Sequence, residues 1–289
     1  MSAFDYAAMT GRNLGFVTAA EQKRLREGRV FVCGVGGMGG ACLQSLARAG
    51  VGALEIADFD AFEISNLNRQ VFATVPDLGR PKTEVTEQRL HEIHPDLDVH
   101  VHGRDWLDHL DVILARCRVV VNAMDDTAAG IRIYREAKDR GGTVIDAYTS
   151  TLPSVTRVLP TDRRPEERLG YPTAGVALDR ITKVMLDACR LAELEYVFTH
   201  SSTADHVDWA IAAEVMAGTR PRMSFAPMVI TTGNLMAYEA VAALCKRPTP
   251  TDCRGWFFNP YRARVERPRS ALVAAIRRAA VRRQLARFR

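Results

Sequence analysis

Residues 29–40 read RVFVCGVGGMGG, and this stretch decides the fold. The apolar run at 30–32 predicts a short buried strand, which breaks into a glycine-rich turn. Residues 41–49 have the composition of a helix, and the apolar run at 53–57 predicts a second strand. Strand, turn, helix and strand in this order are typical of an α/β fold with a parallel sheet.

The glycines of this turn carry the first functional signal. Gly34, Gly36 and Gly39 satisfy the G-x-G-x-x-G pattern of a nucleotide-binding turn. Glycine allows the sharp turn, the approach of phosphates to the backbone, and close packing of the helix on the strand. Gly37 would present its N–H to the phosphates at the helix start. Asp58 ends the second strand, where a carboxylate accepts hydrogen bonds from ribose hydroxyls.

The residues that follow indicate which nucleotide is bound. Arginine and lysine neutralise phosphate charge, and a carboxylate at a strand end binds the Mg²⁺ that bridges phosphates. A dinucleotide-dependent dehydrogenase has no need for such a set, whereas a site for the triphosphate of ATP does. The sequence therefore favours ATP with Mg²⁺ over NAD. The residues concerned are Asn66, Arg69, Gln70, Lys82 and Asp125.

These motifs resemble the ThiF/MoeB/HesA family, adenylating enzymes related to the ubiquitin-activating enzymes. The resemblance covers residues 10–150 and becomes loose after that. It implies attack of a substrate carboxylate on the α-phosphate of ATP, which gives an acyl adenylate and pyrophosphate. The matching motifs are G-x-G-G-x-G at 34–39, D-F-D at 58–60, S-N-L-N-R-Q at 65–70, G-R-P-K at 79–82 and Asp-Asp at 125–126.

The resemblance also implies roles for single residues. Asn66, Arg69 and Lys82 would contact the phosphates, and Gln70 would support the arginine loop. Each residue also has a plainer reading. Asn66 on its own is a turn former, and Lys82 on its own is a surface lysine at a helix start. For Asp60 we expect a loop-bracing or helix-capping role rather than ligand binding.

The metal predictions are Mg²⁺ and no zinc. By the resemblance, Asp125 would bind Mg²⁺, with Asp126 beside it. Many relatives carry two C-x-x-C pairs that hold a structural zinc, and this chain has none. By the resemblance, residues 198–224 cross over the substrate, and no cysteine lies in residues 190–244 around them, so we expect no thioester and a reaction that stops at the adenylate or passes it to an external nucleophile. The cysteines, predicted to be reduced and mostly buried, are Cys33, Cys42, Cys117, Cys189, Cys245 and Cys253.

The family also places an arginine ahead of the first strand on the nucleotide phosphates, often across a dimer interface. Arg12 is our candidate by position, and Arg24 and Arg26 are the alternatives. The plain alternative is that all three are surface residues. With Arg12 in this role, the chain is expected to form a homodimer.

The expected fold is a Rossmann-like, mostly parallel sheet with helices on both faces, extended at the C-terminus within the same domain. We divide it into an N-terminal arm and helix (1–28), a nucleotide-binding core (29–150), a substrate and crossover region (151–261) and a basic tail (262–289). Helices are predicted at 18–27, 82–93, 128–139, 180–194 and 227–244, strands at 99–102, 119–123, 143–147, 155–159 and 256–265, and a loop at 160–175.

The net charge of +5 is unevenly distributed. Residues 262–289 hold ten arginines and one glutamate, which is +9, so the remainder carries −4. Such a tail suits nucleic acid, an acidic partner, an acidic patch on the same protein, or plain solvation as a terminal helix. No apolar run approaches the roughly 20 residues of a membrane span, and no secretory signal is evident. A cytoplasmic location without membrane contact is therefore expected.

The identity of the carboxylate stays open. A small acid of a biosynthetic pathway, a peptide, and the C-terminus of a ubiquitin-like sulfur carrier are the candidates. The missing zinc pairs and thiol favour a dedicated cofactor or natural-product pathway over an ordinary sulfur-carrier activator. A tRNA-modifying relative that activates a carboxylate on a nucleoside is the second reading. A dinucleotide-binding oxidoreductase or a non-catalytic nucleotide sensor is the third.

Overall fold

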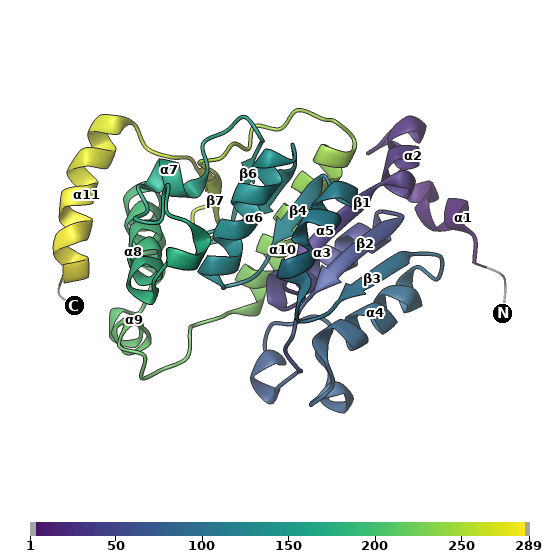
Figure 1. Ribbon diagram of the computed structural model, residues 1–289, viewed down its shortest axis with the longest axis horizontal. Coiled ribbons are helices and arrows are strands. Elements are labelled where there is room, and N and C mark those ends of the chain that lie inside the picture. The colour runs from purple at the N-terminus through teal and green to yellow at the C-terminus, as the bar shows by residue number, and fades with distance from the viewer. Residues whose placement is uncertain (1–3, 287–289) are drawn as a thin grey trace.

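The computed structural model describes residues 4–286 and has one eight-stranded sheet (Figure 1). The strand order is β3-β2-β1-β4-β5-β6-β7-β8. Strands β1 to β5 pair in parallel, whereas β6, β7 and β8 continue the sheet in antiparallel pairs. The predicted α/β class with a mostly parallel sheet is confirmed. The strands are β1 Arg29–Cys33, β2 Ala53–Ala57, β3 Asp98–His102, β4 Val119–Asn122, β5 Thr143–Asp146, β6 Ser154–Val158, β7 Trp256–Asn259 and β8 Arg264–Glu266.

Helices cover both faces of this sheet. The alternation along β1 explains why, because successive side chains of a strand point to opposite faces. Val30 and Val32 pack with α2, α3, α4 and α10, whereas Phe31 and Cys33 pack with α5 and α6. The helices are α1 Tyr6–Thr10, α2 Ala19–Glu27, α3 Gly37–Arg48, α4 Lys82–Ile93, α5 Leu110–Arg116, α6 Thr127–Asp139, α7 Pro165–Leu169, α8 Lys183–His200, α9 Trp209–Met216, α10 Ala226–Leu244 and α11 Ala271–Leu285.

Several predicted boundaries were wrong, and the stretch at 256–265, predicted as one strand, forms the two antiparallel strands β7 and β8. Helix α3 begins at Gly37 rather than at residue 41, because the glycines themselves form its first turn against the sheet. The predicted loop at 160–175 contains α7, which starts at a proline, a residue suited to a first helical turn, and stops at Gly170 in the left-handed conformation. Helix α8 runs six residues beyond the predicted end at 194. The capping box of α2, from Thr18 to Glu21, is present as predicted.

The C-terminal segment folds back onto the rest of the chain. Helix α11 packs on α8 at the end of the molecule away from the N-terminus (Figure 1). Arg287 and Arg289 of the predicted basic tail lie outside the described residues. Within residues 4–286, no helix is long and apolar enough to cross a membrane.

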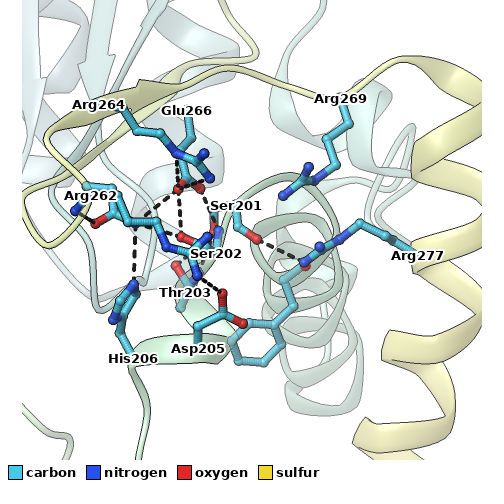
Figure 2. Close-up of polar contacts among 12 residues, drawn as sticks. Ser201, Ser202, Thr203, Asp205, His206, Arg262, Arg264, Glu266, Arg269 and Arg277 are labelled. Atoms are coloured by element: carbon cyan, nitrogen blue, oxygen red, sulfur yellow. Dashed lines mark hydrogen bonds and ion pairs between the residues drawn. The ribbon is translucent and has the colours of Figure 1, made fainter.

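A buried carboxylate organises this C-terminal region (Figure 2). Glu266 on β8 accepts hydrogen bonds from the backbone N–H of Ser202 at 2.6 Å and from its hydroxyl at 2.7 Å. Asn259 Nδ2 donates to Glu266 Oε1 at 3.0 Å, and Arg264 pairs with the same oxygen at 3.2 Å. Burial alone would raise the pKa of Glu266, but these donors hold it at about 2. The network therefore joins β8 to the end of α8.

Candidate nucleotide and metal site

The glycine turn sits where β1 meets α3. Gly34 has φ +84°, in the left-handed region that favours glycine, and its N–H donates to the Ala57 carbonyl at 2.8 Å. A Cβ on Gly34 would lie 2.8 Å from the Ala123 carbonyl oxygen, and one on Gly39 would overlap the Gly34 carbonyl. Both positions therefore need glycine, and α3 starts directly on the ends of β1 and β4.

The next two glycines face the motif loop at 65–70. A Cβ on Gly36 would lie 3.5 Å from the side-chain amide of Gln70, and one on Gly37 would lie 3.5 Å from Arg69 Cγ and overlap Val229. Gln70 is buried, and its Oε1 has no hydrogen-bond partner among residues 4–286. Gly37 opens a twelve-residue helix whose first N–H groups suit an anion. A phosphate on this backbone would lie beside Arg69.

Asp58 holds the turn in place. Its Oδ2 accepts from the Val35 N–H at 2.9 Å and its Oδ1 from the Asp60 N–H at 3.0 Å. Each carboxylate oxygen keeps a lone pair, which leaves room for the predicted ribose contact. The sequence did not foresee the bracing role, because it joins two loops that follow different strands.

Lys82 is not a surface lysine. Its side chain is 8% exposed, and Nζ pairs with Asp60 Oδ2 at 2.8 Å. The backbone N–H of Lys82 also donates to the Asp60 carbonyl, at 2.9 Å. Asp60 thus has the bracing role expected of it, and it aims a buried ammonium at the edge of the sheet where β2 ends.

The motif loop 65–70 is ordered largely by its own residues. Asn66 Oδ1 accepts from the Glu63 N–H at 3.1 Å, as its plainer reading as a turn former requires. Arg69 Nη1 donates to the Ser65 carbonyl and to Asn68 Oδ1, each at 2.9 Å. These contacts hold the guanidinium on the loop that faces the glycine turn.

Two aspartates follow β4, and they do different things. The Asp125 side chain is 80% exposed and pairs with Arg222 at 3.4 Å. Asp126 accepts from the N–H groups of Ala128 and Ala129 and caps α6. No group of three metal-ligating side chains exists among residues 4–286. A single exposed carboxylate still fits Mg²⁺, which in nucleotide sites takes one or two carboxylates plus phosphates and water.

The N-terminal arginines lie far from this edge. Arg24 donates to the Cys245 carbonyl at 3.1 Å, and Arg26 stacks 4.5 Å over the Tyr6 ring. Arg12 is exposed. Its neighbour Asn13 donates to the Ala49 carbonyl at 3.2 Å, which places this segment at the end of α3 opposite the glycine turn.

The cysteines are free thiols, and five of the six are buried. Burial raises the pKa of Cys189, which lies 3.7 Å from the Thr173 hydroxyl. The half-buried Cys253 also has a raised pKa, for the same reason. These environments disfavour the thiolate and so argue against a nucleophile at either position.

Sequence reasoning missed two groups at this edge. Asp146 ends β5 and accepts from Asn122 Nδ2 and the Tyr134 hydroxyl, each at 2.8 Å. Burial raises its pKa to about 7. Arg222 belongs to a distant segment and reaches Asp125 only in the folded chain. Neither had a local signal, because an aspartate after a strand and an arginine in the loop TRPRM are ordinary.

Comparison with known proteins agrees with this geometry. The ThiF family model matches residues 10–274, well beyond the predicted extent of the resemblance. This chain belongs to the ThiF family. Among its relatives is the sulfur carrier protein ThiS adenylyltransferase of Escherichia coli strain K12, 38% identical over 108 residues. That match covers 37% of this chain and 43% of the relative, so this ThiF-family chain matches less than half the length of that protein.

Solved structures share the fold of this ThiF-family chain. E. coli MccB with ATP has a TM-score of 0.61 at 18% identity, covering 87% of this chain and 67% of that one. E. coli tRNA N6-threonylcarbamoyladenosine dehydratase, TcdA, in complex with AMP has a TM-score of 0.60 at 15% identity, covering 85% and 98%. At such identities the likeness concerns the fold.

Proposed function

We propose that this protein is an ATP- and Mg²⁺-dependent adenylyltransferase that activates a substrate carboxylate. The observation that carries the proposal is the convergence of the glycine turn, Lys82, Arg69 and Asp125 on one edge of the sheet. Its ThiF-family membership supports the same chemistry, since the matched E. coli relative is named an adenylyltransferase. Carboxylate attack on the α-phosphate would give an acyl adenylate and pyrophosphate.

Each group has a task in this reaction. The N-terminus of α3 would hold phosphate oxygens through backbone N–H groups, and Asp58 would hold the ribose. Lys82 and Arg69 would supply fixed positive charge where negative charge builds on the phosphates. Asp125 would hold Mg²⁺, which when bound offsets phosphate charge. Asp60 would keep the buried ammonium of Lys82 oriented through their 2.8 Å pair.

The dimer proposal follows from the position of Arg12. The helix α3 has twelve residues and so spans about 18 Å. Asn13 contacts the end of α3 that lies opposite the glycine turn, so Arg12 serves the site of a second subunit or none. Mixing an Arg12→Ala protein with an Asp125→Asn protein should restore up to a quarter of the activity, if subunits exchange. Failure of the mixture in a proven heterodimer would refute this role.

The carboxylate substrate remains a choice among a small biosynthetic acid, a peptide and a ubiquitin-like C-terminus. The raised pKa of each buried cysteine supports release of the adenylate or its transfer to an external nucleophile. The tRNA reading loses its main support, because several tail arginines pair with acids of the same chain. These pairs are Arg262–Asp205, Arg264–Glu266, Arg278–Glu195 and Arg282–Glu195.

Calorimetry tests the proposal without knowledge of the acid. The wild-type protein should bind ATP more tightly than NAD, and Mg²⁺ should strengthen ATP binding. Asp125→Asn should lose the gain from Mg²⁺, because the amide is a poor replacement for a carboxylate ligand. Asp126→Asn is the matched control, since asparagine also caps helices and α6 should be kept.

Binding of NAD in place of ATP would overturn the proposal and support the oxidoreductase reading. A Mg²⁺ response that survives in Asp125→Asn but vanishes in Asp126→Asn would mean that the wrong aspartate was chosen.

A further inference from the structure

The chain between α9 and α10, residues 217–225, is attached to the site by Arg222. Its Nη1 lies 3.4 Å from Asp125 Oδ2, and its Nη2 donates to the Thr149 hydroxyl at 3.2 Å. Asp125 follows β4 and Thr149 follows β5, so the guanidinium bridges the ends of two neighbouring strands. This is the edge at which ligands bind in open α/β sheets.

A second contact ties the same segment to the motif loop. Asn68 Nδ2 donates to the Ser224 carbonyl at 3.0 Å. Asn68 also accepts from Arg69, so the two arginines Arg69 and Arg222 belong to loops joined by one hydrogen bond. Residues 217–225 thus reach from the strand ends to the phosphate-binding loop.

The pairing of Arg222 with Asp125 is easily exchanged. The two side chains are 52% and 80% exposed, and ion pairs this exposed contribute little to stability. Within residues 4–286, Arg222 is the one cation paired with Asp125. A positive group therefore occupies the carboxylate that the proposed function assigns to Mg²⁺. If Asp125 held Mg²⁺ instead, the guanidinium would be released at the edge where the phosphates would bind.

We propose that Arg222 is a phosphate-binding residue of the nucleotide site, delivered by residues 217–225 and held on Asp125 until ATP binds. The inference rests on the proposed function. Arginine suits this task because its planar fork bonds two phosphate oxygens at once. Its ligands would be the β- and γ-phosphates, which are lost as pyrophosphate and carry most of the negative charge of ATP. AMP lacks them and should not engage Arg222.

Arg220 provides a matched control. It lies on the same segment, and its guanidinium pairs with Glu214 of α9 at 3.1 Å rather than with the site. Removing it takes away the same charge from the same loop without touching Asp125. A difference between the two variants therefore reports on position and not on net charge.

The experiment is calorimetry of the full chain with Mg²⁺, using ATP and AMP as separate probes. Arg222→Ala should weaken ATP binding about tenfold and change AMP binding less than twofold. Arg222→Lys should recover part of the loss, and Arg220→Ala should match the wild type. Hydrogen exchange at residues 217–225 gives a second readout: ATP should slow it in the wild type and not in Arg222→Ala.

The outcomes separate the two hypotheses. If the wild type binds no ATP, the proposed function and this inference both fail. If the wild type binds Mg²⁺ and ATP, and Arg222→Ala binds them equally well or more tightly, only the inference fails. An equal loss for ATP and AMP would also overturn it, because a damaged site weakens both ligands.

Discussion

The nucleotide-binding half, residues 29–150, and the C-terminal half, residues 151–286, share one sheet but are held together differently. In the first half, strands β1 to β5 pair in parallel, and β1 to β4 are each followed by helical chain that packs back on the sheet. In the second, Ser154 of β6 pairs with Phe257 of β7, about a hundred residues away. The first half depends on apolar periodicity and glycine, whereas the second adds polar contacts between distant segments to its own apolar cluster.

Arginines of the C-terminal segment bind the end of α8 in the second half. Arg277 of α11 donates to the carbonyls of Phe198 and Ser201, each at 3.1 Å, and Arg269 Nε donates to the Thr199 carbonyl at 3.2 Å. These carbonyls lie at the end of α8, where the last acceptors of a helix lack partners and carry partial negative charge. Figure 2 shows Arg269 and Arg277 reaching this point from the yellow C-terminal segment. The basic tail therefore has a structural role as a helix cap.

The largest expected effect is a loss of stability in the nucleotide-binding half. In Gly39→Ala, the new methyl group overlaps the Gly34 carbonyl oxygen, so α3 cannot pack on β1. We expect a loss of at least about 3 kcal/mol in the free energy of unfolding, measured by urea titration. Gly79→Ala is the control: Gly79 has φ +85° with open space around it, and should cost about 1–2 kcal/mol. Equal losses would contradict the close packing of α3.

A smaller effect should be confined to the second half. Arg277→Ala removes two hydrogen bonds from a charged donor and should cost about 2 kcal/mol of unfolding free energy. Hydrogen exchange should rise at the end of α8 and stay unchanged in the glycine turn. Arg283→Ala on the exposed face of α11 is the control. Faster exchange in both halves would show that they unfold as one unit, and would remove the contrast drawn between them.

The smallest effect is a pH dependence. Burial lowers the pKa of His200 to about 4, and four nearby arginines act in the same direction. The unfolded chain therefore binds a proton at His200 below about pH 6.5, whereas the folded chain does not until about pH 4. The His200 contribution to stability should fall as the pH drops through this window, by about 1 kcal/mol between pH 7 and pH 5.5, whereas Asp146, with its pKa raised to about 7, changes stability in the opposite direction. The arginines are Arg168, Arg269, Arg277 and Arg278.

Urea midpoints at pH 7 and 5.5 measure this effect against His200→Asn. The amide oxygen of asparagine can replace His200 Nδ1, which accepts from the Arg269 N–H at 3.1 Å. The difference in stability between the wild type and the variant, from which the Asp146 contribution cancels, should change by about 1 kcal/mol between the two pH values and be small near pH 7. Glu266 does not interfere between pH 7 and pH 5.5, because its contribution is lost only between its ordinary pKa of 4.5 and its folded pKa of about 2. An unchanged slope in the variant would assign the acid sensitivity to other groups.

The candidate site was only partly predictable. Gly34 and Gly39 were found because their backbone conformation or packing requires glycine, which is visible in the sequence. Lys82 was found because its motif follows the other motifs in a fixed order along the chain. The partner of Lys82, Asp60, was expected to brace a loop, but the ion pair itself appears only in the fold. Arg222 was missed because nothing within the loop distinguishes it from Arg220.

The sequence alone determined the family, the α/β class and the order of the strands through residue 150, but not helices α1 and α5. Periodicity, glycine spacing and capping are patterns within short windows of sequence. Parallel strands that alternate with helices can be predicted from such patterns. Only the tertiary structure decided that β6 to β8 run antiparallel, that Arg277 caps α8, and that Arg222 lies on Asp125. The β6–β7 pairing, the Arg277 contacts and the Arg222–Asp125 pair join residues about 75 to 100 positions apart. These interaction partners meet only when the fold brings distant residues together, and they pair by charge and shape. No local sequence pattern therefore predicts them.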